Sequence, residues 1–292
     1  MNKIITVVFL ILISSEISYA QYAYFSTRGT ISYDKTVYTR AKMRDMQQNF
    51  GNNTRGGFGG GRMFDIENVP ESSTEKYILE FDENSTLMYN QTESSDQNKT
   101  RENRGSLGRT RGATRNSAVT HISSSAGITI SPGIRPNNSS KILAQNLKNS
   151  TTEVQIQIDD KYIITDSINE ITWRFSDEYR NIAGYECRRV NGATNDSLYI
   201  IAFYTDEIPI SAGPALTGGL PGMILGLVIP EMHIQYWATK VEYSNNIINN
   251  QWKDKKAKPI TLDEFISSFG RFFQRGRDSN SSKRQVQEQL LY

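Results

Sequence analysis

Cysteine and histidine are scarce in this chain of 292 residues, which contains one cysteine and two histidines. The single cysteine, Cys187, excludes a disulfide within the chain. His121 and His233 are the only histidines, and the sequence contains neither a Gly-x-Ser-x-Gly nor a His-Glu-x-x-His motif. These absences speak against a histidine-dependent hydrolase. We therefore expect a protein that is not an enzyme, with a hydrolase built on carboxylates alone as the enzymatic alternative.

Long apolar runs are also missing, except near the N-terminus. Residues 1–20 combine a lysine, an apolar stretch of about ten residues and small residues at Ser18 and Ala20. This pattern is typical of a secretory signal peptide, and its apolar stretch is too short for a transmembrane helix. The sequence thus predicts an exported protein that does not span a membrane. We expect it in the periplasm, at the outer membrane or outside the cell.

The formal net charge of +2 implies no strongly charged partner overall, but arginine and glycine are concentrated in two segments of low complexity. These segments are residues 49–62 and 93–140, and we predict that both are disordered inserts. Their composition leaves too little apolar surface to offset the entropy of ordering the chain. Inside a cell, an arginine-glycine segment would suggest RNA binding. Behind a signal peptide we expect no nucleic-acid partner and favour contact with anionic lipid or polysaccharide.

Short runs of alternating apolar and polar residues dominate the rest of the expected domain, residues 21–274. Residues 76–89 predict a hairpin that turns at 82–84, and residues 153–165 predict a second hairpin that turns at 159–160. Successive hairpins of this kind indicate a mainly β fold with an antiparallel sheet and one buried face. Further strands are predicted at residues 30–38, 171–175, 185–190, 198–204, 222–229 and 233–243.

A C-terminal helix is predicted after Pro259. Thr261 and Glu264 have the spacing of a capping box, and apolar residues at 262, 265, 266, 269 and 273 lie on one helical face. The tail, residues 275–292, is polar, and we expect it to be flexible. A short helix over residues 286–291 is the alternative for its last part.

The most distinctive run in the chain is TDEIPISAGPALTGGLPGMIL, residues 205–225. Pro221 and Gly222 suit the central positions of a type II turn, in which Gly222 would have a positive φ. Residues 223–229 form a short apolar run, as expected of a buried strand. The segment is interpreted in two ways: as a strand, a turn and a strand that serve the fold alone, or as the rim of a binding surface.

The core of this run resembles the signature of the GLPGLI family of exported proteins in the Bacteroidota. Trp173, residues 182–187 and residues 29–33 also resemble the family pattern, so the likeness spans residues 25–90 and 150–270, outside the inserts. Met223 departs from the isoleucine or leucine that is usual in the signature. The residues that form the signature loop are Gly213, Pro214, Gly219, Leu220, Pro221 and Gly222.

The resemblance leads to two expectations. The strand order is similar to that of open half-barrels that carry lipoproteins across the periplasm, in which a helix closes the concave apolar face of a curved sheet. The predicted fold is therefore a curved antiparallel sheet, open as a half-barrel, with a C-terminal helix. Exported proteins of this phylum are O-glycosylated at short acceptor sites. The tripeptides Asp166-Ser167-Ile168 and Asp196-Ser197-Leu198 resemble these sites, which makes Ser167 and Ser197 candidate sites.

Sulfur-containing residues are the remaining candidates for chemistry. Arg188 and Arg189 follow Cys187 and could lower its pKa, but we favour a half-buried strand residue. Met223, Met232 and His233 offer thioether and imidazole groups that suit Cu(I). We favour the alternative, in which Met223 packs in the core and the other two begin a strand. Neither a metal nor a cofactor is therefore expected.

Two functional hypotheses follow. The first is a non-enzymatic envelope protein that docks to an outer-membrane transporter or assembly complex through the signature turn or the basic inserts. The second is a carrier of a lipid or other hydrophobic ligand on the concave sheet. A continuous apolar cavity would favour the carrier, whereas a solid core with an exposed apolar patch would favour docking. We favour docking.

Overall fold

The computed structural model describes residues 27–45, 66–91, 141–168, 170–195, 197–273, 286 and 290–292. The expected signal peptide and both expected inserts lie outside these ranges, as does His121. Of the expected tail, residue 286 and residues 290–292 are described. Among the helices of the described residues, none is long and apolar enough to cross a membrane.

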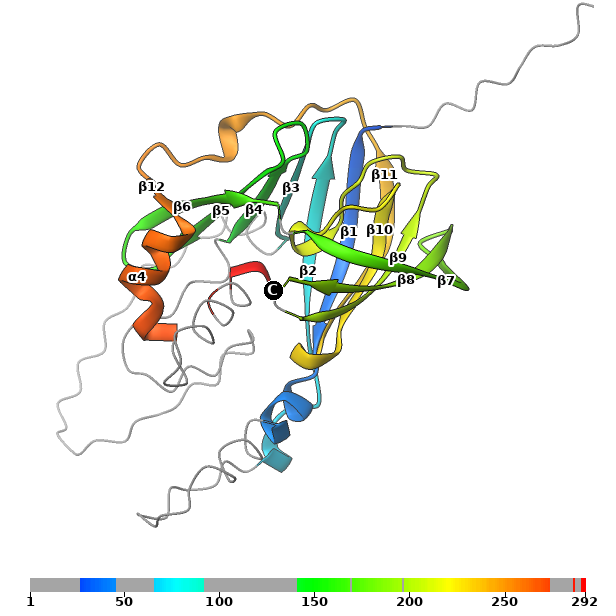
Figure 1. Ribbon diagram of the computed structural model, residues 1–292, viewed down its shortest axis with the longest axis horizontal. Helices are drawn as coiled ribbons and strands as arrows, with labels where there is room; N and C mark the ends of the chain where they lie inside the picture. Colours follow the sequence, from blue (N-terminus) through cyan, green and yellow to red (C-terminus); the bar gives the residue numbers. More distant parts are fainter. Residues whose placement is uncertain are drawn as a thin grey trace, which may run out of the picture.

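Twelve strands form one sheet in this part of the chain (Figure 1). They are β1 (Gly29–Val37), β2 (Ser73–Phe81), β3 (Ser85–Asn90), β4 (Ile142–Asn146), β5 (Thr151–Gln157), β6 (Lys161–Ser167), β7 (Ile171–Ile182), β8 (Tyr185–Thr194), β9 (Tyr199–Thr205), β10 (Met223–Ile229), β11 (Ile234–Tyr243) and β12 (Lys258–Thr261). The helical segments are residues 39–45, η1 (Ile66–Asn68), η3 (Pro214–Leu216), η4 (Pro230–Met232), η5 (Asn250–Trp252) and α4 (Leu262–Phe273), and residues 286, 290 and 291 of the tail are helical as well.

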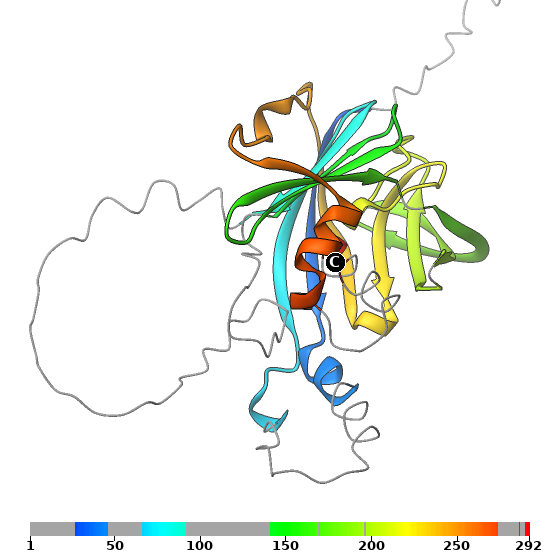
Figure 2. The same ribbon diagram turned by 60° about the vertical axis from the view of Figure 1, so that its left-hand side comes forward.

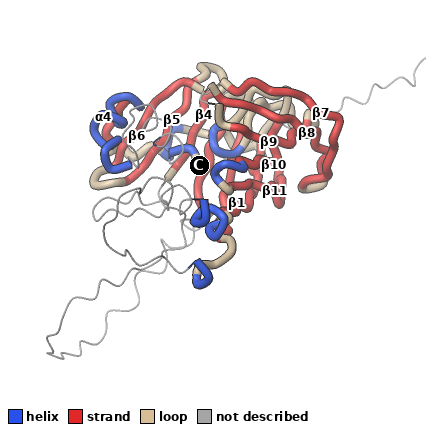
Figure 3. The backbone as a smooth tube through the Cα atoms, turned by 60° about the horizontal axis from the view of Figure 1, so that its bottom comes forward, coloured by secondary structure: helices blue, strands red, loops and turns tan. Residues whose placement is uncertain are grey.

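The strand order is β12-β6-β5-β4-β3-β2-β1-β11-β10-β9-β8-β7. Neighbouring strands are antiparallel, except that β12 pairs with β6 in parallel. β12 and β7 are the two edges, so the sheet is open. Figures 1 and 3 show the strands bent around the point where residue 292 lies. The predicted fold, a curved and open antiparallel sheet with a C-terminal helix, is confirmed.

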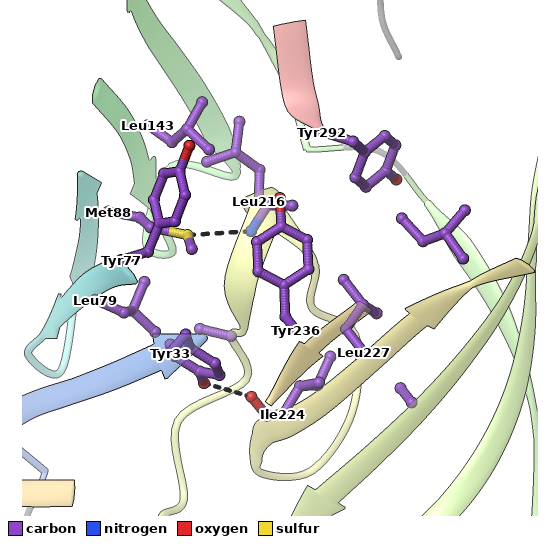
Figure 4. Packing of buried hydrophobic residues seen from close by; sticks show 14 of the residues in the cluster. Tyr33, Tyr77, Leu79, Met88, Leu143, Leu216, Ile224, Leu227, Tyr236 and Tyr292 are labelled. Carbon is purple, nitrogen blue, oxygen red and sulfur yellow. Dashed lines mark hydrogen bonds between the residues drawn. The ribbon is translucent and has the colours of Figure 1, made fainter. Parts of the chain in front are cut away.

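β1 shows how the sequence selects the buried face. Its nine residues alternate between buried and half-buried positions, because side chains along a strand point to opposite faces in turn. Ile31, Tyr33, Lys35 and Val37 therefore point the same way, into the curve of the sheet. We call this side the inner face. It carries most of the apolar core, part of which is drawn in Figure 4.

Both predicted hairpins are present, as β2 with β3 and as β5 with β6. Two strands were not predicted. β4 is a short strand that begins next to the second insert, and β12 contains Pro259, which usually argues against a strand. β12 lies at an edge of the sheet, where a residue without an N–H group is tolerated.

The predicted capping box is present at the start of α4. The main-chain N of Glu264 donates to Oγ1 of Thr261 at 3.3 Å, and the main-chain N of Thr261 donates to Oε2 of Glu264 at 2.9 Å. Phe265 of α4 is fully buried, and the Phe269 ring lies 5.2 Å from that of Tyr162 in β6. The helix thus covers the inner face at the β6 end of the sheet (Figure 2).

Candidate functional site

The six signature residues belong to a segment, residues 206–222, that connects β9 to β10 and lies against the inner face of the sheet; from here on, the signature loop means this whole segment. The buried signature residues are Gly213, Pro214, Leu220 and Gly222, and the exposed ones are Gly219 and Pro221. Leu220 is only 2% exposed. The loop therefore fills the curve of the sheet and presents the turn around Gly219 to solvent, so it combines a structural role with a place at the rim.

Hydrogen bonds fix the middle of the signature loop to two strands of the inner face. The main-chain N of Ala215 lies 3.4 Å from Sδ of Met88 in β3. In β4, Nε2 of Gln145 donates to the main-chain oxygen of Thr217 at 3.4 Å. These bonds give the buried polar groups of the loop partners inside an apolar core, which keeps their burial from being costly.

Two aromatic side chains hold the ends of this region. The hydroxyl of Tyr33 in β1 donates to the main-chain oxygen of Ile224 at 2.6 Å (Figure 4). The indole Nε1 of Trp173 in β7 donates to the main-chain oxygen of Gly218 at 3.0 Å. The Trp173 bond thus attaches the loop to the β7 edge of the sheet, and the Tyr33 bond joins β1 to the start of β10, directly after the loop.

The backbone of the signature loop corrects one expectation. Gly222 does not have the positive φ of a type II turn; Gly219 does, with φ +82°. Gly222 is required for another reason, because a Cβ atom there would lie 2.0 Å from the main-chain oxygen of Thr205. Ala215 and Leu216 also have left-handed φ values of 56° and 59°, which non-glycine residues adopt rarely.

An exposed aromatic row adjoins the exposed turn of the loop. We define the β7 aromatic row as Trp173, Phe175 and Tyr179. They lie opposite alternate residues of β8, from Gly192 to Arg188, so all three point to the same face. Phe175 is 49% and Tyr179 57% exposed. Large aromatic side chains with this exposure on one edge strand form a candidate contact surface.

Arg188 of β8 places a positive charge beside the β7 aromatic row. The guanidinium of Arg188 lies 5.3 Å from the centre of the Phe175 ring, and it pairs with Asp177 at 3.2 Å. The Phe175 ring also meets the Tyr204 ring edge to face, with centroids 6.1 Å apart. Aromatic residues and arginine are the residue types that contribute most to protein interfaces.

Sequence reasoning missed a pair of buried lysines on the inner face. Lys35 in β1 is 2% exposed, and Lys141, directly before β4, is 4% exposed. Burial lowers the pKa of Lys35 to about 8, against the opposing effect of Glu75. Burial, assisted by Lys35, also lowers the pKa of Lys141 well below its usual value. The alternation of β1 carried a signal, because it places Lys35 on the same face as Ile31, Tyr33 and Val37.

The two most distinct hollows among the described residues differ in size and position. The first has a volume of about 30 Å³ and lies on the inner face, between Ile164 of β6, Leu262 of α4 and Leu290. It is close to the volume of one water molecule. The second, of about 360 Å³, lies over Glu80 and Leu87 on the outer face, below the 246–249 segment.

The remaining predicted residues lie on three different parts of the sheet, and Ser167 lines the first hollow together with Leu216 of the signature loop. Ser167, at the end of β6, and Ser197, before β9, are both exposed. Cys187 is buried in β8, and burial, with a contribution from Glu207, raises the pKa of its thiol to about 12. The neighbouring arginines therefore do not produce a reactive thiolate.

The copper hypothesis fails on geometry. Met223 is fully buried at the first position of β10, and Met232 follows the end of that strand. A strand of this length separates them by roughly 20 Å. Nε2 of His233 lies 2.7 Å from Oδ2 of Asp45, within hydrogen-bond distance. Within the described residues, no group of three His, Cys, Asp or Glu side chains converges on a point.

Comparison with known families bears on the signature loop. Residues 190–226 match the model of a family described as "Protein of unknown function (Porph_ging)". The match runs from β8 through β9 and the whole signature loop into β10, so the segment identified by its sequence pattern is also the segment that matches. No curated protein matches the chain.

Solved structures with a similar chain course include two crystal forms of PNGF-II. The structure in the C2 space group has 12% identity and a TM-score of 0.46, and the match covers 89% of this chain and 32% of that one. The structure in the P21 space group has 12% identity and a TM-score of 0.48, covering 85% and 34%. This chain thus spans about a third of the length of these structures. A likeness of this degree carries no information about function.

Proposed function

We propose that the protein is an exported, non-enzymatic accessory protein of the cell envelope that docks to an outer-membrane partner through the β7 aromatic row. The exposure of Phe175 and Tyr179 beside the turn of the signature loop carries the proposal. The partner would be a transporter or an assembly protein. The proposal assigns no catalytic step to the chain.

The packing of the inner face supports docking over an open carrier. The signature loop and α4 occupy the curve of the sheet, and the inner cavity of about 30 Å³ is far below the ~300 Å³ or more of usual ligand pockets. The expected alternative, a carrier of a lipid or other hydrophobic ligand, therefore requires one of the segments on the inner face to leave.

A photo-crosslinking amino acid at position 179 tests docking in the native host. We expect one crosslinked product of defined mass that contains an outer-membrane protein. Tyr199 is the matched control, because it is 44% exposed but lies opposite Ala193, on the other face of the sheet. Equal products from both positions, or none from position 179, would contradict the proposal.

A second experiment tests the same surface without a probe. The double substitution Phe175→Ser and Tyr179→Ser should remove the complex seen by native mass spectrometry of protein purified from the envelope in mild detergent. Tyr199→Ser should leave the complex intact. Thermal unfolding of each variant distinguishes loss of contact from loss of fold, since Phe175 also packs on Tyr204.

A further inference from the structure

The segment that runs from β11 to β12, residues 244–257, passes over the outer face of the sheet (Figure 1). We call it the outer arch. Near its start, the main-chain N of Ile248 donates to Oδ2 of Asp82 at 3.0 Å. Oδ1 of Asp82 accepts the main-chain N–H groups of Asn84 and Ser85 in the β2–β3 turn, at 2.9 and 2.8 Å. Because Asp82 is only 5% exposed, this end of the arch is tied to a buried side chain.

Ion pairs and a hydrogen bond fix the far end of the outer arch. Nζ of Lys253 lies 2.6 Å from the carboxylate of Glu153 in β5, and Oδ2 of Asp254 lies 2.6 Å from Nζ of Lys161 in β6. The main-chain N of Asp254 donates to Oε1 of Gln155 at 2.8 Å. The arch is thus attached to the sheet at both ends, so the space beneath its middle has fixed walls.

The hollow of about 360 Å³ lies between these two attachments, and we call it the outer hollow. Its volume falls within the ~300–1,000 Å³ of usual small-molecule sites. Its floor is formed by Glu80 of β2 and Leu87 of β3, which lie directly opposite each other in the strand pairing. The side chains of the arch that form its walls include Asn246, Ile247, Asn249 and Trp252. The lining therefore combines an indole ring, aliphatic groups, two amides and a carboxylate.

Two polar groups of the outer hollow are already oriented by the protein. Oε1 of Glu80 accepts a hydrogen bond from the hydroxyl of Tyr89 at 2.7 Å, which holds the carboxylate in place. Oδ1 of Asn249 accepts the main-chain N–H of Gln251 at 3.0 Å, so the side-chain NH₂ is the group that Asn249 offers as a donor. A ligand that binds oriented groups avoids the entropy cost of ordering them.

The charge of the lining limits the class of ligand. Glu80 is the ionisable residue among those that line the outer hollow, so an anion would be repelled there. Lys253 lies 5.3 Å from the centre of the Trp252 ring, but its charge is paired with Glu153. A purely aliphatic ligand would cover the carboxylate and the amides without giving them hydrogen bonds, which is unfavourable. A neutral ligand that carries hydroxyl groups satisfies both conditions.

We propose that the outer hollow binds a neutral saccharide. A sugar ring presents C–H groups on one face, and the face of an aromatic ring attracts such groups because it carries partial negative charge. The ring therefore packs on Trp252 and on Ile247, which is 66% exposed without a ligand. Hydroxyl groups at the edge of the sugar donate to Glu80, and another accepts from the NH₂ group of Asn249.

This inference goes beyond the proposed function and does not rest on it. β7, which carries the β7 aromatic row, lies six strands away from β2 in the sheet. Loss of the docking surface therefore leaves the outer hollow intact, and the reverse is also true. The two proposals can fail separately.

Saturation-transfer NMR on the full chain tests the proposal with the methyl glycosides of glucose, galactose, mannose and N-acetylglucosamine. We expect at least one of these to bind with a Kd of roughly 1 mM, as is usual for a ligand of this size. Trp252→Ala and Glu80→Gln should each weaken binding by about tenfold or more. Tyr199→Ser, an exposed aromatic position on β9, is the control and should leave binding unchanged. Binding that persists in both variants of the hollow, or no binding of any glycoside at about twentyfold this Kd, would overturn the proposal.

A further variant covers the case in which Trp252→Ala or Glu80→Gln does not fold. Asn246→Trp fills the outer hollow from an exposed position and keeps both attachments of the arch. It should abolish glycoside binding without a change in thermal unfolding. Tetramethylammonium tests the competing ligand class, since a cation also suits an aromatic ring beside a carboxylate. If this cation binds and its binding is lost in Asn246→Trp, while no glycoside binds, the hollow is a cation site and the proposal is wrong.

Discussion

The indole Nε1 of Trp173 donates a 3.0 Å hydrogen bond to the main-chain oxygen of Gly218. This bond joins the edge strand of the sheet to the signature loop, which is far away in sequence. The ring also packs closely on Gly192, where a Cβ atom would lie 2.5 Å from it. The exposed turn of the loop and the β7 aromatic row are therefore parts of one continuous surface.

Replacement of Trp173 tests this connection. Trp173→Phe removes the hydrogen bond and leaves the Gly218 oxygen to find another partner, so we expect the free energy of unfolding to fall by about 1–3 kcal/mol. Trp252→Phe is the control, since Trp252 lies on the outer hollow away from the loop. Urea denaturation measures both. An equal loss of unfolding free energy in the two variants would show that the hydrogen bond from Trp173 to Gly218 does not stabilise the fold.

Gly222 and Gly184 are positions that require glycine for two different reasons, a close backbone contact at Gly222 and a positive φ at Gly184. Gly222→Ala forces a Cβ atom to within 2.0 Å of the Thr205 main-chain oxygen, and backbone cannot yield as a flexible side chain does. We expect a loss of more than about 3 kcal/mol, or no folding. Gly184→Ala meets no atom within 4 Å but has φ +93°, so its strain should cost about 1–2 kcal/mol. Comparable losses in urea denaturation would contradict this assignment.

Local patterns predicted most of the fold. Strict alternation with short acidic turns predicted the β2–β3 and β5–β6 hairpins, and the Thr261-x-x-Glu264 spacing predicted the start of α4. These signals succeed because they depend on neighbours in sequence. β12 could not be predicted in this way, because its pairing with β6 is parallel and links residues about a hundred positions apart.

The sequence alone does not predict that Lys35 and Lys141 lie together on the inner face. Lys35 and Lys141 come together because β1, β2, β3 and β4 are adjacent in the sheet, with the second insert between β3 and β4. The alternation of β1 indicates that Lys35 points inward, but nothing near it in sequence identifies its companions. Likewise, the Pro221-Gly222 pair suggested a turn, whereas the close approach of Thr205 to Gly222 depends on the pairing of β9 with β10.

The capping box of α4 gives a third prediction. Thr261→Ala should lower the free energy of unfolding by about 1 kcal/mol, while Thr261→Ser keeps the hydroxyl and most of the stability. Hydrogen bonds from the Thr261 main chain and side chain lower the pKa of Glu264. The contribution of this carboxylate is therefore present at neutral pH and lost as the pH falls through its folded pKa. Thermal unfolding of the three proteins at neutral and acidic pH would show both effects.

The two candidate acceptor serines give a fourth prediction. Ser167 and Ser197 are exposed, so an enzyme can reach both hydroxyls. If they are glycosylated, protein purified from its native host should lose mass in the Ser167→Ala and Ser197→Ala variants by more than the single oxygen removed. Ser267→Ala, on the exposed side of α4, is the control. Intact masses that change only by the oxygen at both positions would reject the modification.

The buried lysines predict an unusual alkaline profile of stability. Lys35 has a pKa of about 8 in the folded protein and about 10.5 when it is exposed. Between these values the unfolded chain binds more protons than the folded one, so the free energy of unfolding rises with pH, by up to about 3 kcal/mol from Lys35. Lys141, whose pKa is also lowered, acts in the same direction. Above about pH 10 the buried Tyr33 and Tyr236, whose pKa values burial raises, act in the opposite direction.

The measurement is therefore urea denaturation from about pH 7 to about pH 9.5, where the lysines dominate. The unmodified protein should gain stability across this range. Lys35→Met should reduce the slope, because its side chain has no proton to lose while Lys141 still contributes, and should raise stability most at neutral pH, where the buried ammonium is most unfavourable. Lys240→Met should keep the slope of the unmodified protein. A flat profile in the unmodified protein would contradict the burial of Lys35 as an ammonium group on the inner face.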